Sequence, residues 1–206
     1  MNRYSILEDF IQFLKDNIKE NIYRAGIEEF SRNGFMKTKM QDIAKRAGIS
    51  VGLTYSYYQN KEDLFSAIVE PIYHEINQSM KGKNSEELEK NNVSHLFEKE
   101  SFFILHLLKD KRKIFLILFD LSKGTSYEKA KDEIINNTKE HIKKQLKPKI
   151  NKHKFEINEE FYHILANNFI EGLLEIARHY KGRNWSKNML NLLMHQYYYG
   201  VRGFHR

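Results

Sequence analysis

Hydrophobic residues recur at helical spacing along most of the 206-residue chain. In the stretch 20–31, Ile22, Ala25 and Phe30 fall on one face of an amphipathic helix, at intervals of three to five residues. Similar patterns predict short helices over 39–46 and 51–57 and a further helix after Asn60. The longer helices are expected over 93–109, 111–122, 127–147, 157–180 and 185–200. The pattern therefore predicts an all-α fold.

Two of the short helices are separated by a turn. Gly48 suits that turn because glycine tolerates positive φ, and Ser50 is a natural N-cap for the helix that follows. Ile43, Ile49 and Leu53 are spaced to pack between the two helices. A helix, a short glycine turn and a second helix together make a helix-turn-helix.

Other boundaries carry capping signals. Gly34 follows Asn33 and is expected to end the first helix. Thr38 and Gln41 have the spacing of a capping box, in which the Thr38 hydroxyl accepts from the third helical amide and Gln41 reaches back to the cap. Asn60 is expected to cap the next helix.

Composition narrows the class of protein. With 41% hydrophobic and 13% aromatic residues, the chain is too apolar to be disordered, and two prolines leave few helix breakers. Zero cysteines exclude disulfides and thiolate chemistry. Acidic residues interrupt the N-terminal stretch, and Lys109 to Lys113 divide the most apolar run, so we expect neither a secretory signal nor a membrane span. We therefore expect a cytoplasmic protein without membrane contact.

The net charge of +7 favours an anionic partner, and part of that charge is concentrated. Residues 32–61 hold six basic residues and one acid, Asp42. The basic residues are Arg32, Lys37, Lys39, Lys45, Arg46 and Lys61. Two other basic runs, 139–154 and 178–206, are interpreted as solvated faces or loops.

The helix after the glycine turn carries hydroxyls suited to DNA. Gly52 allows close approach of the backbone, while Thr54, Tyr55 and Tyr57 supply hydroxyl groups and Lys61 adds charge. Taken alone, this pattern also fits an ordinary αα corner with surface tyrosines.

The wider stretch is more specific. The run "IYRAGIEEFSRNGFMKTKMQDIAKRAGISVGLTYSYYQNKEDLF" resembles the N-terminal DNA-binding domain of the TetR family of transcriptional regulators over about residues 20–65. The resemblance implies a three-helix helix-turn-helix domain followed by a C-terminal helical bundle for ligand binding and dimerisation. The expected division is an N-terminal extension 1–17, a DNA-binding domain 18–65 and a ligand-binding and dimerisation domain 66–206.

The resemblance also implies roles for single residues. Thr38, Tyr57 and Lys61 are expected to hold phosphates, while Val51, Leu53 and Tyr55 lie where family members meet bases or the adjoining backbone. The full predicted DNA-contacting set is Thr38, Lys39, Ser50, Val51, Gly52, Leu53, Thr54, Tyr55, Tyr57 and Lys61. Val51 and Leu53 stand where the family often has polar residues, and apolar side chains there favour thymine methyl groups. Tyr58 is assigned to the core, with its hydroxyl at the rim.

The C-terminal half carries the other implied functions. Two wide apolar stripes predict a dimer interface built from the last two long helices. Its residues are Phe161, Leu165, Phe169, Leu173, Leu190, Leu193, Met194 and Tyr197. Periodicity alone equally allows these stripes to be intramolecular core. The effector pocket is expected at Phe103, His106, Leu107, Phe119, His163 and Asn167, although a single His on an apolar face more often has no ligand.

The predicted function is therefore that of a dimeric regulator, a repressor released from a palindromic double-stranded DNA operator by a small, largely apolar effector. No cofactor or metal is expected. Glu160 and His163 form half of a di-iron motif, but the second half is missing from the sequence, so catalysis is unsupported. The alternative is a basic helical protein that binds nucleic acid or membranes without sequence preference. The extension has an apolar stripe of Ile6, Phe10, Phe13 and Leu14, which either lengthens the first helix or packs on the domain.

Overall fold

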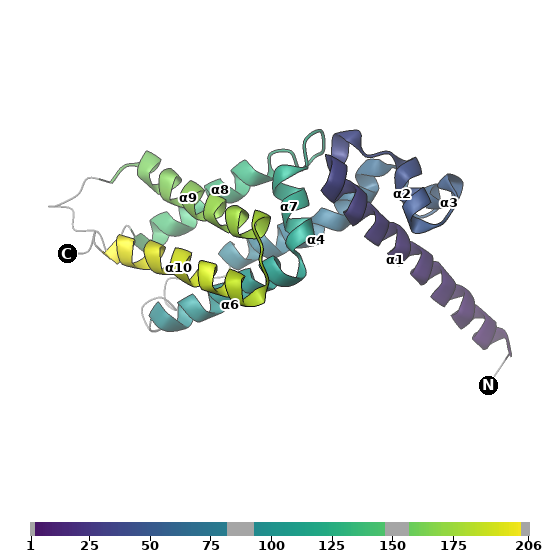
Figure 1. Ribbon diagram of the computed structural model, residues 1–206, viewed down its shortest axis with the longest axis horizontal. Coiled ribbons are helices and arrows are strands. Elements are labelled where there is room, and N and C mark those ends of the chain that lie inside the picture. Colours follow the sequence, from purple (N-terminus) through teal and green to yellow (C-terminus); the bar gives the residue numbers. More distant parts are fainter. Residues whose placement is uncertain (1–2, 82–92, 147–156, 203–206) are drawn as a thin grey trace. The chain divides into compact units, whose positions relative to one another are not determined.

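The computed structural model describes residues 3–81, 93–146 and 157–202, and all its regular structure in these ranges is helical (Figure 1). The chain divides into two compact units. The N-terminal unit comprises Met1–Pro71 and Ile117–Glu128, and the C-terminal unit comprises Ile72–Leu116 and Lys129–Arg206. The predicted all-α class is confirmed.

The N-terminal unit is built on a long first helix, α1 (Arg3–Lys37). Residues 1–17 were assigned to an extension, and from Arg3 onward this segment lengthens the first helix, which decides between the two alternatives. Gly34 interrupts α1 with φ 69° and ψ 169°, and helical turns resume up to Lys37. The predicted stop at Gly34 is therefore a kink within the helix.

The helix-turn-helix is formed by α2 (Met40–Ala47) and α3 (Val51–Tyr55). Gly48 closes α2 in the left-handed region with φ 71°, and its N–H reaches the carbonyls of the last turn. The Ser50 hydroxyl accepts from the Leu53 N–H at 3.2 Å. Both expectations are confirmed, because each end of the turn has the residue that its backbone requires.

The predicted capping box at Thr38 is wrong. The N-cap of α2 is Lys39, and no side chain caps that helix. Thr38 is buried, and its hydroxyl donates to the Gly34 carbonyl at 2.8 Å and lies 3.2 Å from the Glu29 carbonyl. A buried hydroxyl takes whichever partner its surroundings offer, and here the carbonyls of α1 are nearest.

The core of the N-terminal unit is a cluster of aromatic rings between α1 and α4 (Lys61–Lys81). The Phe65 ring meets Phe30 edge-on at 5.1 Å and Phe35 at 5.3 Å between centroids. Asn60 caps α4 as predicted, since its side-chain oxygen accepts from the Asp63 N–H at 2.9 Å. Pro71 lies inside α4, which continues to Lys81.

The segment Ile117–Glu128 completes this unit, although it begins 36 residues after the end of α4 in the sequence. The Phe35 N–H donates to the Leu121 carbonyl at 3.1 Å. The Ser126 N–H and hydroxyl both donate to the Glu62 carboxylate, at 2.9 and 3.0 Å. The Tyr127 ring lies 6.3 Å from Phe65, and burial raises the pKa of its phenol. The observed division therefore differs from the predicted continuous boundary at residue 65.

The C-terminal unit contains α6 (Val93–Asp110), the first part of α7 (Arg112–Asp120), α8 (Ala130–Leu146), α9 (Glu159–Arg178) and α10 (Arg183–Arg202). Each of these helices was predicted to within about three residues. Helix α9 packs on both α8 and α10, and α10 also packs on α6. Gly172 on α9 lets α10 approach closely, because a Cβ atom there would lie 2.8 Å from the Leu193 side chain.

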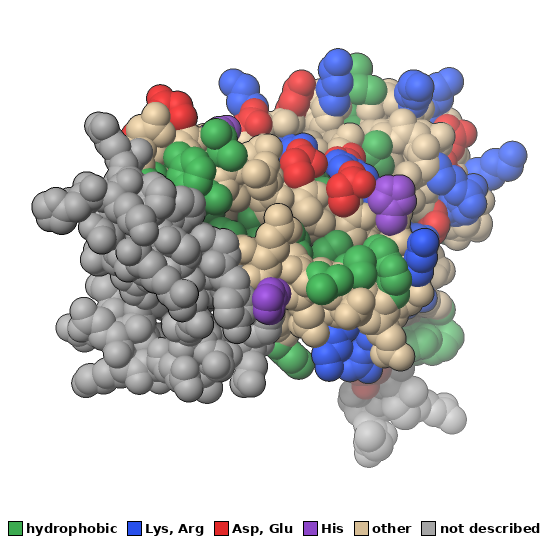
Figure 2. Space-filling view, turned by 60° about the vertical axis from the view of Figure 1, so that its left-hand side comes forward, with side chains coloured by type: hydrophobic (Ala, Val, Ile, Leu, Met, Phe, Trp, Pro, Cys, Tyr) green, Lys and Arg blue, Asp and Glu red, His purple; other side chains and the backbone are tan. Residues whose placement is uncertain are grey.

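Three residues of the predicted dimer interface belong to the core of this unit. Leu173, Leu190 and Met194 are buried within the single chain, so their assignment to a dimer contact is wrong. For these three residues the intramolecular reading of the apolar stripes holds, since periodicity marks the apolar residues without saying what covers them. Ile164 on α9 and Leu192 on α10 are exposed. Figure 2, which brings forward the side of Figure 1 where these helices are drawn, shows hydrophobic side chains reaching the surface between charged ones.

Two further observations concern only the described residues. No helix among them is both long and apolar enough to cross a membrane. No group of three or more His, Asp or Glu side chains among them is placed to hold a metal ion.

The glycines of the helix-turn-helix give a matched test. A Cβ atom at Gly48 or Gly52 would meet nothing within 4 Å, but only Gly48 has positive φ. Gly48→Ala is expected to lower the free energy of unfolding by ~1–2 kcal/mol, because an alanine is strained in the left-handed region. Gly52→Ala, inside α3, is expected to leave stability unchanged or raise it by up to ~1 kcal/mol. Chemical denaturation followed by circular dichroism measures both, and equal losses would contradict this account.

Candidate nucleic-acid interface

Helix α3 presents one face outward and one inward. Gly52 is exposed, Tyr55 is 47% exposed, and Leu53 is also exposed, whereas Thr54 is fully buried. Leu53 was expected to pack between the two helices, and this exposure shows that it does not. The outward face offers an open backbone at Gly52, an apolar side chain at Leu53 and a phenol at Tyr55. Such a face can enter a groove and contact base edges.

Two of the hydroxyl groups that were predicted to contact DNA are buried in the structure. The Thr54 side chain is 0% exposed, and its hydroxyl lies 3.2 Å from the Ser50 carbonyl. The Thr38 hydroxyl is buried against the carbonyls of α1, as described above. Both hydroxyls are therefore satisfied within the unit and cannot reach a phosphate without a rearrangement.

Lys61 has an internal role that the sequence does not show. Its ammonium group donates to the carbonyls of Phe35 at 2.7 Å and Thr38 at 3.0 Å, and it lies 4.1 Å from the centre of the Phe35 ring. Partial burial lowers the pKa of Lys61, and the nearby Glu62 carboxylate opposes that shift. Lys61 lies in the first turn of α4 and binds the carbonyls at the C-terminal end of α1. A cation is favourable at the C-terminal end of a helix.

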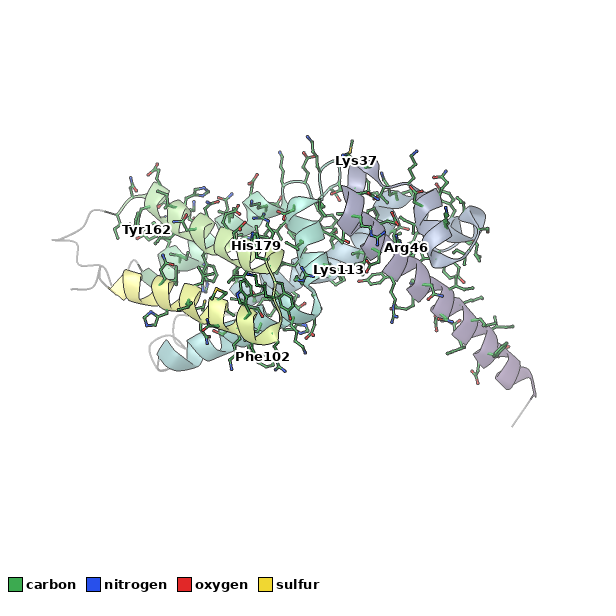
Figure 3. The ribbon with its side chains drawn as sticks, in the orientation of Figure 1. Lys37, Arg46, Phe102, Lys113, Tyr162 and His179 are labelled. Atoms are coloured by element: carbon green, nitrogen blue, oxygen red, sulfur yellow. The ribbon has the colours of Figure 1, made fainter. Side chains whose placement is uncertain are left out.

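Arg46 is also committed internally. Its guanidinium meets the Glu29 carboxylate at 2.5 Å, and the second oxygen of Glu29 accepts from Asn33 at 3.0 Å (Figure 3). Glu29 is the one buried acid among the described residues. A buried carboxylate needs this pairing, so the ion pair ties α2 to α1. The sequence prediction missed it because Glu29 looks like any other charged helix residue.

The basic patch of residues 32–61 therefore divides in two. Arg46 and Lys61 bond within the unit, although Arg46 is itself exposed, whereas Arg32, Lys37, Lys39 and Lys45 are exposed and are not bonded across the unit in this way. Lys39 lies directly before α2 and Lys45 in its last turn. Of these exposed cations only Lys39 was in the predicted contact set, and their place in the charged run was the signal that could have found the others.

The remaining predicted contacts lie on or beside α3. Ser50 is exposed and caps the helix, Val51 is half-buried, and Tyr57 is half-buried just after the helix. Tyr58 is buried, as expected, and burial is the main cause that raises the pKa of its phenol.

The predicted effector residues do not gather in one unit. Phe119 is buried in the N-terminal unit, whereas the other five belong to the C-terminal unit. There, Leu107 is buried and Phe103 and Asn167 are half-buried. His106 lies 3.1 Å from the Asp110 carboxylate, and His163 is exposed. The histidines thus face solvent or a neighbouring charge, and the pocket stays a prediction.

The sequence of this region matches a known family of proteins. Residues 22–68 match the family model described as bacterial regulatory proteins, tetR family. This match to the TetR family covers 47 of the 206 residues. The matched segment contains α2, α3 and the cap of α4, which are the elements that shape the exposed face.

Individual relatives extend the comparison. The transcriptional repressor NicS of Pseudomonas putida is 33% identical over 64 residues, which are 31% of this chain and 30% of NicS. The chain thus aligns with less than a third of that curated relative. NalD of Pseudomonas aeruginosa, the secondary repressor of the MexAB-OprM efflux pump, superposes with a TM-score of 0.57 at 18% identity, over 87% of this chain and 95% of NalD. FadR of Bacillus subtilis in complex with stearoyl-CoA gives a TM-score of 0.51 at 19% identity, over 84% and 96%. At these identities the solved structures establish the fold alone.

Lys61 and Lys45 form a matched pair that separates structure from binding. Lys61→Met is expected to lower the free energy of unfolding by ~1–2 kcal/mol, because two carbonyls lose a charged donor. Lys45→Met is expected to change stability by less than ~0.5 kcal/mol and to reduce the salt dependence of DNA binding by about one ion. Denaturation and binding titrations at several salt concentrations measure both effects. If Lys61→Met leaves stability unchanged but lowers the salt dependence, Lys61 holds a phosphate instead.

Proposed function

We propose that this protein is a sequence-specific DNA-binding regulator that represses transcription and is released from its operator by a small effector. The observation that carries the proposal is the outward face of α3, where Gly52, Leu53 and Tyr55 are exposed and Ser50 fixes the start of the helix. The names of the relatives, which are regulators rather than enzymes, support the same class. We place its action in the cytoplasm, where such DNA is found.

Contacts to DNA divide by residue type. Lys37, Lys39 and Lys45 are the cations that phosphates would meet, because they are exposed in the same unit as α3. Leu53 and Tyr55 face outward and would meet base edges. An apolar side chain such as Leu53 discriminates through thymine methyl groups, so we propose an operator with A·T pairs opposite α3.

A dimer would place two copies of α3 on one operator. On α9, Phe161, Leu165 and Phe169 are half-buried and Ile164 is exposed, while α10 adds Leu193, Tyr197 and the exposed Leu192. The Phe169 and Tyr197 rings lie 5.4 Å apart, which joins the two helices into one apolar face. A two-fold axis through this face would give a palindromic operator with half-sites about one turn, ~34 Å, or a multiple apart.

The proposed effector is small and largely apolar. Phe103 and Leu107 on α6 supply the apolar side chains, and the fold likeness to FadR with stearoyl-CoA makes a long-chain acyl-CoA the first compound to try. Such a ligand can release DNA only by binding one conformation more tightly than the other. Titration of the protein–operator complex with stearoyl-CoA tests this ligand class, and operator affinity that stays constant would remove it.

Selection from random duplex DNA tests the main proposal. An enriched palindrome is expected, and Tyr55→Ala should cost ~1–3 kcal/mol on that sequence while leaving binding to random DNA nearly unchanged. Lys45→Met is the control, because loss of a phosphate contact weakens binding to both sequences alike. Binding without enrichment that only fades as salt rises would favour the alternative, a basic protein that binds nucleic acid or membranes without sequence preference.

The proposed dimer interface has its own test. The double variant Ile164→Glu, Leu192→Glu is expected to have a smaller solution mass than the wild-type protein, because each charge would have to be buried in the contact. Phe102→Glu, a change on the exposed face of α6, is expected to keep the wild-type mass. Light scattering after gel filtration measures these masses, and a double variant of unchanged mass would rule out the α9–α10 contact.

A further inference from the structure

The N-terminal half of α1 carries an apolar face that the described residues leave uncovered. Phe10 is 56% and Phe13 is 64% exposed, and Ile11 and Leu14 between them are also exposed. Figure 1 and Figure 3 show this part of α1 running clear of α2 and α3, with side chains along it that meet no other element. Four large apolar side chains within five positions form a contiguous exposed patch, which isolated apolar residues on a surface do not.

The same helix is well covered farther along. Ile18 is half-buried, and Ile22, Ala25 and Phe30 are buried in the core of the N-terminal unit. The apolar face of α1 is therefore continuous, covered after Ile18 and open before it. A helix of this length in water is stabilised mainly by packing of its apolar face. The open half thus lacks the packing that the covered half has.

Charge around the open face indicates what covers it. At 3.6 residues per turn, the apolar side chains span about 160° of arc. Lys15 lies beside Ile11 at one edge of the polar arc, with Glu8 and Lys19 farther round the helix. Glu20 lies beside Phe13 at the other edge, with Asp9 and Asp16 farther round, and Glu20 pairs with Arg24 at 2.6 Å.

This arrangement is complementary to itself. When two copies of the helix pack side by side in parallel, each basic edge faces the acidic edge of the other copy, and the apolar faces meet. An antiparallel pair would set acidic edge against acidic edge. Residues 8–20 hold four acids and two lysines, which disfavours DNA and an anionic membrane as the covering surface.

We propose that the N-terminal half of α1 is a self-association element that packs in parallel against the same helix of a second copy of this chain. The contact lies outside the α9–α10 face and does not depend on DNA binding. It joins the proposed dimers into higher assemblies and thereby promotes joint occupation of neighbouring operators, because linked binding sites raise each other's effective concentration.

Cysteine crosslinking in the full-length chain tests the contact. The sequence contains no cysteine, so any disulfide reports an introduced thiol. In a parallel pair Leu14 faces Leu14 of the second copy, whereas Gln12 points to the opposite side of the helix. Leu14→Cys is expected to form disulfide-linked dimers at least 10-fold faster than the control Gln12→Cys in the same redox buffer. Equal rates for the two variants would overturn the proposal.

Two further sets of substitutions test whether the α1 contact is independent and parallel. Crosslinking through Leu14→Cys is expected to persist with Ile164→Glu and Leu192→Glu present, and its loss there would mean that α1 has no contact of its own. Lys15→Glu is expected to slow crosslinking several-fold, and adding Glu20→Lys to restore it. Unchanged rates in these charge variants would overturn the parallel arrangement.

The alternative is that a membrane covers the apolar face of α1. The Leu14→Cys variant tests this alternative as well. Leu14→Cys protein carrying an environment-sensitive dye is mixed with neutral phosphatidylcholine vesicles. The dye is expected to show no spectral shift, and the unlabelled Leu14→Cys protein is expected to crosslink when no vesicles are present. A blue shift on vesicles from a variant that does not crosslink would overturn the proposal in favour of lipid binding.

Discussion

The N-terminal unit depends on a buried carboxylate that must be paired. Glu29 lies under α2, where an unpaired charge would be costly, and Arg46 and Asn33 occupy its two oxygens. The pair holds the last turn of α2 against α1. Because α3 follows after a turn of three residues, the direction of α3 is set by the same contact. The direction of the exposed face of α3 thus depends on an ion pair between α1 and α2.

This contact also explains why charge counting overstates the binding surface. The six basic residues of 32–61 suggested a basic patch for DNA, and two of them bond to groups inside the unit. Arg46 serves a carboxylate and Lys61 serves the open carbonyls at the end of α1. Their charges stabilise the fold that carries the other four. A sequence shows how many charges are present, but only burial shows which ones remain available to a ligand.

Helices and their boundaries were the features best predicted from sequence. The spacing of Ile22, Ala25 and Phe30, the glycine at 48 and the caps at Ser50 and Asn60 act locally, so a local pattern is sufficient to find them. Thr38 and Thr54 were misassigned because a hydroxyl binds whatever lies nearest in space. Leu173, Leu190 and Met194 were misassigned because an apolar stripe does not distinguish its own core from a partner. The exposed Ile164 and Leu192 continue the same stripes.

The segment Ile117–Glu128 has a consequence for the order in which the protein is made. Leu121, Ser126 and Tyr127 supply contacts to Phe35, Glu62 and Phe65 of the N-terminal unit. On the ribosome the chain emerges from its N-terminus, so α1 to α4 leave the exit tunnel well before this segment does. Until then the aromatic core lacks one wall. The N-terminal unit of a nascent chain therefore cannot be complete until more than half of the protein has been translated.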